Sequence, residues 1–149
     1  MKAVIQRVSQ ADVTVDQKII GSIEVGLVIL VGVAEGDTVA DAEWLVQKIV
    51  NLRIFGDHEG KLNLSLLDIS GEVLCISQFT LMADYKKGNR PSFIKAARPD
   101  QAIPLFDLFK EKMASHQLRV ASGIFGADMK VSLVNDGPVT IVMDSQTKM

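Results

Sequence analysis

The stretch Gly26-Leu27-Val28-Ile29-Leu30-Val31-Gly32-Val33-Ala34 determines the fold class. Its nine residues include no polar side chain. A strand with one face in water alternates apolar and polar residues, whereas a strand covered on both faces is apolar throughout. The run falls well short of the roughly 20 apolar residues that a membrane-spanning helix needs. The stretch therefore predicts a central strand with other elements packed on both of its faces.

Two amphipathic helices are expected after this strand. The first begins near Thr38, which is followed three residues later by Asp41 in the manner of a capping box. Its apolar side consists of Ala42, Leu45, Val46, Ile49 and Leu52. The second is expected to have Asp100 as its cap and Pro104 in its first turn, where proline is tolerated. Its apolar side consists of Ile103, Leu105, Phe106, Phe109 and Met113.

Further apolar segments, most of them rich in β-branched residues, predict the remaining strands. They cover residues 3–8, 13–15, 18–25, 62–66, 72–81, 129–134 and 139–143. Residues 84–99 are expected to form an irregular loop, and residues 145–149 a loose tail. No linker or repeat divides the chain, so residues 1–149 are expected to form a single α/β domain with many strands and two helices.

Composition narrows the class of protein further. The chain has 149 residues, of which 48% are hydrophobic and 23% charged, as in an ordinary globular domain. A single cysteine, Cys75, excludes an internal disulfide framework and a Cys-rich zinc site, and favours the reducing cytoplasm. Gln6 and Arg7 interrupt the apolar start, so a signal peptide is not expected. The net charge of −2 means that a nucleic-acid site has to be sought in local charge.

The common catalytic signatures are absent from the sequence. It contains no Gly-x-Ser-x-Gly elbow, no His-Glu-x-x-His helix and no phosphate loop. His58 and His116 are the only histidines, and both lie among polar residues. A Ser-His-Asp triad and a histidine-rich metal site are therefore not expected, and neither a metal nor a cofactor is predicted.

The segment Ser77-Gln78-Phe79-Thr80-Leu81 places polar side chains where a hydrophobic strand ends. Strand ends often carry functional groups, because the sheet holds them rigidly. Taken alone, these residues favour the simpler interpretation, which is a strand whose solvent face carries Ser and Thr.

The segment Asn135-Asp136-Gly137-Pro138-Val139-Thr140 lies between two expected strands. Asp-Gly in that position normally indicates a tight hairpin, but Pro138 has no N–H for the closing hydrogen bond. The turn is therefore wider, or it serves another purpose. Gly137 has no side chain, so another chain or a ligand can come close to its backbone. Taken alone, the residues favour a loose hairpin.

Local positive charge is concentrated between Asp84 and Arg98. The basic residues there are Lys86, Lys87, Arg90, Lys95 and Arg98, against Asp84 as the only acid. Tyr85 and Phe93 lie among them. Cations interleaved with aromatic rings suit phosphate contacts and base stacking. A solvated basic loop explains the same pattern equally well.

Together these segments resemble the D-aminoacyl-tRNA deacylase family. The matching segments, in the family's order, are residues 1–8, 77–81, 88–93, 123–129 and 135–140. The resemblance covers the chain except for the tail after Asp144, with no departure at the motif positions. It implies an α/β deacylase fold of mixed, barrel-like strands with two main helices packed outside.

The resemblance also implies a homodimer with its active sites at the subunit interface. In the family a cis Gly-Pro pair reaches into the partner's pocket, and Gly137 and Pro138 match that pair. The opposite, catalytic wall would be formed by Ser77, Gln78, Phe79 and Thr80. Phe125 and Met129 match the family segment near the terminal adenosine of tRNA, and Arg7 matches the residue that braces the turn. Further residues expected to act are Lys86, Lys87 and Arg90 toward tRNA, and Asn135 and Thr140 as support for the turn.

The implied activity is hydrolysis of the ester that joins a D-amino acid to tRNA. L-aminoacyl-tRNA would be rejected sterically, and glycyl-tRNA accepted in part. Thr80 is one candidate nucleophile, but no motif residue is an evident base for its hydroxyl. The family's other mechanism, in which the 2′-hydroxyl of the last ribose assists water, is therefore favoured. The competing classes are a non-catalytic nucleic-acid-binding module and an esterase that acts on esters without RNA.

Overall fold

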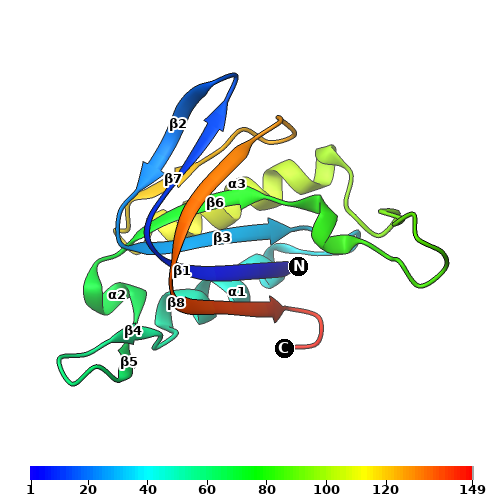
Figure 1. Ribbon diagram of the computed structural model, residues 1–149. Helices are drawn as coiled ribbons and strands as arrows, with labels where there is room; N and C mark the ends of the chain where they lie inside the picture. The colour runs from blue at the N-terminus through cyan, green and yellow to red at the C-terminus, as the bar shows by residue number, and fades with distance from the viewer. Residues whose placement is uncertain (149) are drawn as a thin grey trace.

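A bent six-stranded sheet with two long helices on one side forms the fold (Figure 1). The structure is a computed structural model and describes residues 1–148. Its strands are β1 (Lys2–Val15), β2 (Lys18–Ile23), β3 (Gly26–Gly32), β4 (Phe55–Gly56), β5 (Leu62–Leu64), β6 (Glu72–Ser77), β7 (Val120–Ser122) and β8 (Lys130–Asp144). Its helices are α1 (Val39–Asn51), α2 (Leu66–Ile69), α3 (Pro99–Ala114) and the 3-10 helix η1 (Phe79–Met82). The predicted α/β class with two main helices is confirmed.

The central strand of the sheet is β3. The order is β2-β1-β3-β6-β7, and β8 lies along the other side of β1. β3 runs antiparallel to β1 and parallel to β6, which in turn runs parallel to β7. Lys2 at the start of β1 therefore lies between Gly32 at the end of β3 and Asp144 at the end of β8. The same sheet edge also holds Ser77, at the end of β6.

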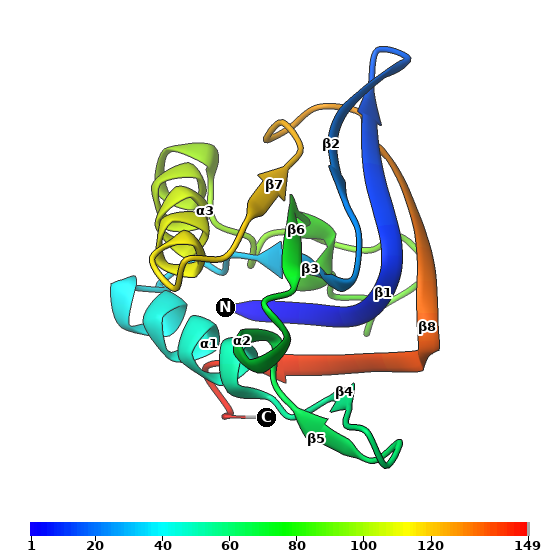
Figure 2. The same cartoon turned by 90° about the vertical axis from the view of Figure 1, so that its left-hand side faces the viewer.

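β1 and β8 are long, bent strands that belong to two layers of the sheet (Figure 2). The first half of β1 pairs with β3 and its second half with β2, while β8 follows it along most of its length. The sequence predicted two separate strands in each place, which is wrong. The register between β1 and β8 shifts at Gln6/Val8 and again at Val8/Gln10. Such bulges bend a strand without ending it, which gives the barrel-like curvature.

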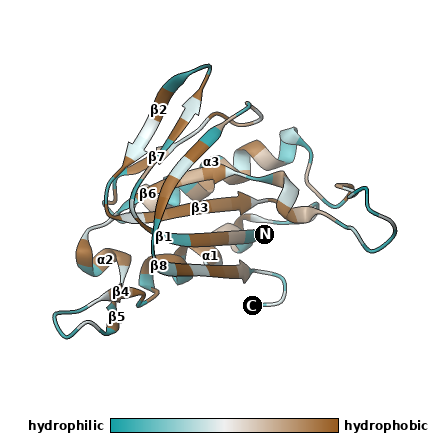
Figure 3. Ribbon diagram, viewed as in Figure 1, coloured by the Kyte–Doolittle hydropathy of each residue, from teal (hydrophilic) through white to brown (hydrophobic). Residues whose placement is uncertain are grey.

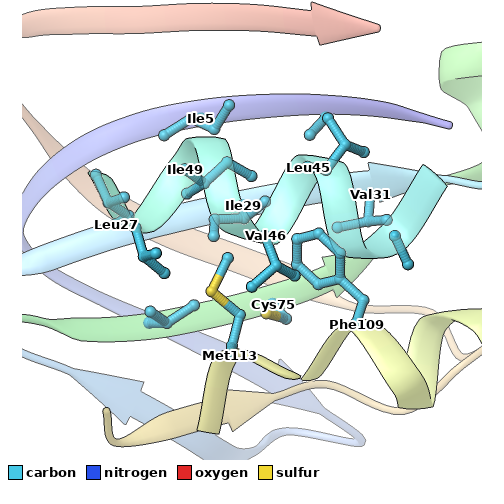
Figure 4. Packing of buried hydrophobic residues seen from close by; sticks show 14 of the residues in the cluster. Ile5, Leu27, Ile29, Val31, Leu45, Val46, Ile49, Cys75, Phe109 and Met113 are labelled. Atoms are coloured by element: carbon cyan, nitrogen blue, oxygen red, sulfur yellow. The ribbon is translucent and has the colours of Figure 1, made fainter. Parts of the chain in front are cut away.

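Both faces of β3 are covered, as the sequence predicts. Leu27, Ile29 and Val31 pack in the core cluster between the sheet and the two long helices (Figure 4). Val28 packs in a second cluster, between the two layers of the sheet. The helices contribute Leu45, Val46, Ile49, Phe109 and Met113 to the first cluster. Burial on both faces explains why β3 is coloured as hydrophobic along its length in Figure 3.

The two long helices begin differently. At α1 the predicted capping box is present, since the Thr38 N–H donates to Asp41 Oδ2 at 2.8 Å. The prediction that Asp100 caps α3 is wrong, because the helix begins at Pro99 and its N-cap is Arg98. Proline is favoured at the first helical position, where its missing N–H has no intrahelical partner. Pro104 consequently lies inside the helix and not in its first turn.

Three further segments differ from expectation. The strand expected over 72–81 ends at Ser77 and is followed by η1, and the strand expected over 62–66 is shortened by α2. β7 lies in a segment for which no strand or helix was expected. Ser65 begins α2, because its hydroxyl accepts a hydrogen bond from the Asp68 N–H at 3.1 Å. A serine N-cap of this kind competes with continued strand.

The segment expected to be a loose tail begins with a buried residue, whereas residues 146–148 are exposed. Ser145 is only 2% exposed, and its Oγ accepts a hydrogen bond from the Met1 amino group at 2.8 Å. The Lys148 ammonium lies 4.3 Å from the centre of the Trp44 ring, within the range of a cation–π contact. Met149 lies outside the described residues. The segment after β8 is therefore packed against the start of β1 and against α1.

Candidate active site

A cavity of about 250 Å³ opens at the end of β6. One wall is formed by Ser77, Gln78 and Phe79, where the chain leaves the sheet and turns into η1. The opposite wall is residues 125–129 together with Val131. The structure thus brings together the predicted catalytic segment and the two residues expected near adenosine, Phe125 and Met129. Parallel pairing of β6 with β7 carries the 125–129 loop to this position.

Thr80 does not line this cavity, but it is tied to a residue that does. Gln78 Nε2 donates a hydrogen bond to Thr80 Oγ1. An amide nitrogen is a donor and cannot remove the proton of the hydroxyl. The contact orients the Thr80 side chain and leaves it without an activating base.

The backbone at this wall has two N–H groups that face no helical partner. η1 begins at Phe79, and its first internal hydrogen bond runs from the Leu81 N–H to the Gln78 carbonyl at 3.2 Å. The N–H groups of Phe79 and Thr80 precede that bond. The Gln78 N–H is already used, since it donates to the Val31 carbonyl at 2.8 Å. The N–H of Phe79, which lines the cavity, and the N–H of Thr80, one residue beyond its lining, therefore have no partner within the 3-10 helix.

Aromatic and small residues shape the rest of the cavity. The Phe79 ring is 56% exposed and meets the Phe93 ring edge-on, with centres 5.1 Å apart. Phe125 packs against Phe106 of α3 at 6.4 Å. Gly123 has no Cβ, and a Cβ there would collide with the Met129 sulfur. Sequence reasoning gave Gly123 no separate role, although it allows Met129 to close the wall.

The Gly-Pro turn of β8 is held by Arg7. The Gly137–Pro138 peptide is cis, and Gly137 has a φ of +138°. Arg7 Nε donates to the Asp136 carbonyl at 2.9 Å, and Nη1 donates to the Ile54 carbonyl at 2.8 Å. One planar guanidinium therefore ties the turn to the segment after α1. Ile54 was not identified from the sequence, because it contributes only a backbone oxygen.

Asn135 closes the base of the same turn. Its Nδ2 donates to the Arg7 carbonyl at 2.9 Å and to the Val139 carbonyl at 3.0 Å. Its Oδ1 lies 3.5 Å from the Thr140 hydroxyl, which also accepts from Gln6 Nε2 at 3.3 Å. Side-chain hydrogen bonds thus connect the residues before Gly137 with those after Pro138. Neither Gly137 nor Pro138 lines the cavity beside Ser77 in the same chain.

The basic loop, defined here as residues 84–98, is attached to the site. Asp84, at its start, forms an antiparallel bridge with Ser92 inside the loop, and the Lys95 ammonium lies 3.4 Å from Asp84 Oδ2. The pKa of Asp84 is lowered by a hydrogen bond from the Lys86 N–H and by Lys95. Contact of Phe93 with Phe79 connects the loop to the cavity wall. Basic residues on the loop that form no ion pair within residues 1–148 include Lys86, Lys87 and Arg90.

The geometry speaks against a cysteine nucleophile. Cys75 is fully buried in β6, and burial raises the pKa of its thiol to about 12 despite the nearby Lys110. A thiol with such a pKa is protonated at neutral pH and is a poor nucleophile. Residues 1–148 contain no group of three or more His, Cys, Asp or Glu side chains arranged to hold a metal. Over the same residues, no helix has the length and hydrophobicity to cross a membrane.

Comparison with known proteins identifies the family of this chain. A D-aminoacyl-tRNA deacylase of Flavobacterium psychrophilum is 57% identical over 149 residues, covering 99% of both chains. One of Akkermansia muciniphila is 56% identical, again covering 99% of both. The solved structure of a c-Myc DNA unwinding element binding protein superposes with a TM-score of 0.91 at 42% identity, covering 97% of this chain and 98% of the other. Residues 4–144 match the family described as D-Tyr-tRNA(Tyr) deacylase, and the chain belongs to that family.

Proposed function

We propose that this chain hydrolyses the ester bond of D-aminoacyl-tRNA and releases free tRNA and the D-amino acid. The carrying observation is the cavity at the end of β6, where Ser77, Gln78 and Phe79 face Phe125 and Met129. Its volume of about 250 Å³ suits the terminal adenosine of an RNA and excludes a longer stretch of the chain. Family membership over residues 4–144 supports the same activity.

The chemistry rests on backbone groups and on the substrate. Attack of water on the ester carbonyl generates an oxyanion, which needs fixed donors. The N–H groups of Phe79 and Thr80 are free of helical partners and serve as those donors. No imidazole or carboxylate holds the Thr80 hydroxyl, so the 2′-hydroxyl of the terminal ribose assists the water instead. Thr80 positions the Gln78 side chain.

Chiral selection comes from the Gly137–Pro138 backbone. Arg7 and Asn135 hold this turn from two sides. A fixed backbone excludes the side chain of an L-amino acid by collision and does not need to recognise any D side chain. The turn does not line the cavity of its own chain, so it acts on the cavity of a second copy. The functional unit is accordingly a homodimer with shared sites, working on tRNA in the cytoplasm.

The basic loop contributes contacts to the tRNA. Lys86, Lys87 and Arg90 are exposed, and the loop is fixed beside the cavity by the contact of Phe93 with Phe79. Cations in this position neutralise phosphates near the acceptor end.

Release of amino acid from charged tRNA tests the activity. The protein is incubated with D-tyrosyl- and L-tyrosyl-tRNA, and the free amino acid is measured over time. Rapid release of the D-amino acid alone supports the proposal. A binding module leaves both esters intact while retaining the RNA, and an esterase without RNA specificity also cleaves D-tyrosine methyl ester. Either result contradicts the proposal.

Subunit mixing tests the shared site. Variants Gly137→Ala and Gln78→Ala each damage a different wall. In a homodimer with sites across the interface, mixing them restores activity, because one site of each hybrid has both walls intact. Sedimentation as a monomer, or no recovery on mixing, contradicts the shared site.

A further inference from the structure

A second cavity, of about 380 Å³, lies beside the basic loop and away from the Ser77 cavity. Its lining includes the buried Met82 side chain, the Tyr85 ring, and the side chains of Lys2, Lys86 and Asp144. It shares no residue with the cavity at the end of β6. Of the residues that line it, the proposed function gives a role to Lys86 alone.

The two cavities open on the same edge of the sheet. Ser77 lies at the end of β6, and Lys2 and Asp144 lie at the adjoining ends of β1 and β8. η1 joins the cavities, since Phe79 at its start lines one and Met82 at its end lines the other. Strands about 4.8 Å apart place the two sites roughly 10–15 Å from each other. A short single-stranded RNA end covers that distance.

The chemistry of this second cavity suits a nucleobase. Tyr85 is 74% exposed, so a nucleobase can stack on its ring. The buried Met82 side chain lines the same cavity. Lys2 and Lys86 form no ion pair among the described residues, which leaves both ammonium groups for a phosphate or a base carbonyl. The third lysine in the lining, Lys95, is held by Asp84 at 3.4 Å.

Asp144 gives the cavity a preference among bases. Its Oδ1 accepts the Gln146 N–H at 2.9 Å, and within residues 1–148 its Oδ2 has no hydrogen-bond partner. A carboxylate oxygen accepts a hydrogen bond from the N4 amino group of cytosine. Uracil presents a carbonyl oxygen at that position, which a carboxylate repels. A base whose edge faces this oxygen is therefore expected to be cytosine in preference to uracil.

We propose that this cavity binds a cytidine of the CCA end of tRNA, with its base stacked on Tyr85 and its amino group on Asp144. The proposal rests on the proposed function, because the terminal adenosine in the Ser77 cavity brings the preceding cytidines to this edge. The protein would then bind the part of the acceptor end that all tRNAs share.

Binding of short RNA tests the site independently of catalysis. The probes are the 5′-phosphorylated ribotrinucleotides CCA and UUA, titrated by calorimetry into the intact protein. The unmodified protein is expected to bind CCA about tenfold more tightly than UUA. Asp144→Asn keeps an acceptor for the Gln146 N–H and is expected to lose this preference. Equal binding of CCA and UUA by the unmodified protein, or a preference that survives in Asp144→Asn, overturns the proposal.

Tyr85 is tested with two variants and two esters. Tyr85→Ala is expected to raise the KM for the D-alanyl ester of CCA about tenfold, because one stacked base is lost, while Tyr85→Phe retains the unmodified KM. The KM for D-alanyl-adenosine, which has no cytidine, stays unchanged in both. Equal losses on the two esters place Tyr85 in the adenosine site and overturn the proposal. Absence of any hydrolysis by the unmodified protein overturns the proposed function instead, and the binding titration then decides this site alone.

Discussion

Arg7 Nε donates to the carbonyl oxygen of Asp136 at 2.9 Å, which fixes the residue directly before Gly137 to the middle of β1. The same guanidinium reaches the Ile54 carbonyl at 2.8 Å. Only a side chain with several donors in one plane satisfies two carbonyls in this way. The position of the turn therefore depends on the shape of the Arg7 side chain as well as on its charge.

Replacing Arg7 by lysine tests this dependence. An ammonium satisfies one of the two carbonyls at best, so one charge-assisted hydrogen bond, worth about 1.5–3 kcal/mol, is lost. We expect kcat/KM for D-aminoacyl-tRNA to fall about tenfold or more, with a small decrease in Tm. Steady-state kinetics and thermal unfolding of the same preparation separate the two effects. Unchanged kinetics in Arg7→Lys show that the turn keeps its position without the second bond.

Local composition predicted those parts of the fold that depend on burial alone. The apolar run of β3 indicated cover on both faces, and the Thr38–Asp41 pair indicated the start of α1. The bends of β1 and β8 depend on bulges between strands about 130 residues apart, which leave no local pattern. Arg7 contacts the backbone carbonyl of Ile54, so the residue type at position 54 does not predict this contact. Composition and spacing did not predict that residues 77–80 lie close to Phe125 and Met129. The family resemblance alone placed them in one site.

Cys75 is expected to be inert in the folded protein. Burial raises its pKa to about 12, so at pH 8 only about one thiol in 10,000 is ionised. Iodoacetamide is expected to leave the native protein and its deacylase activity unchanged, whereas the denatured protein takes up one equivalent. Because the folded pKa lies above the ordinary value of 9.0, this thiol also makes stability fall as pH rises beyond about 9. Rapid alkylation of the native protein, measured by mass spectrometry, contradicts this account.

Thr80→Ala separates the two mechanisms of ester hydrolysis. An obligatory threonine nucleophile predicts activity near background, whereas assistance by the ribose predicts a loss of less than about tenfold. We expect the second result, because Thr80 Oγ1 is held by the Gln78 amide and not by a base. tRNA ending in 2′-deoxyadenosine is then a poor substrate for the unmodified enzyme. Normal turnover of that deoxy substrate, charged with a D-amino acid, contradicts the assignment.

The basic loop is expected to act through phosphates. Changing Lys86, Lys87 and Arg90 to glutamine removes three cations that have no ion pair within residues 1–148. Each contact between a cation and a phosphate makes binding more sensitive to salt concentration. The slope of log Kd against log salt concentration is therefore expected to decrease by about 2–3 in the triple variant. The rate at saturating tRNA changes little. Lys61→Gln, on the distant segment between β4 and β5, is the matched control. An unchanged slope identifies the loop as merely solvated.

Chiral exclusion by the turn makes a prediction about the smallest amino acid. A filter that works by collision with an L side chain has nothing to reject in glycine, which has no side chain. Glycyl-tRNA is therefore expected to be hydrolysed measurably, while L-alanyl-tRNA survives at enzyme concentrations that clear D-alanyl-tRNA. Hydrolysis of L-alanyl-tRNA, or complete resistance of glycyl-tRNA, contradicts exclusion as the mechanism.

Gly137→Ala tests the same filter from the protein side. Gly137 has a φ of +138°, which L residues rarely adopt, and an added Cβ lies 2.8 Å from Val139 Cγ2 and 3.0 Å from Arg7 Nη2. Either the turn or the Arg7 guanidinium has to move, so the bond to Asp136 and the position of the excluding backbone change together. We expect kcat/KM for D-alanyl-tRNA to fall at least about tenfold, and the ratio of D to L hydrolysis to fall with it. Gly36→Ala is the matched control, because Gly36 also has a positive φ, of +92°, but has open space around its Cβ position. If both variants lower stability while only Gly137→Ala lowers the D-to-L ratio, the loss of selectivity follows from the position of the turn and not from backbone strain as such.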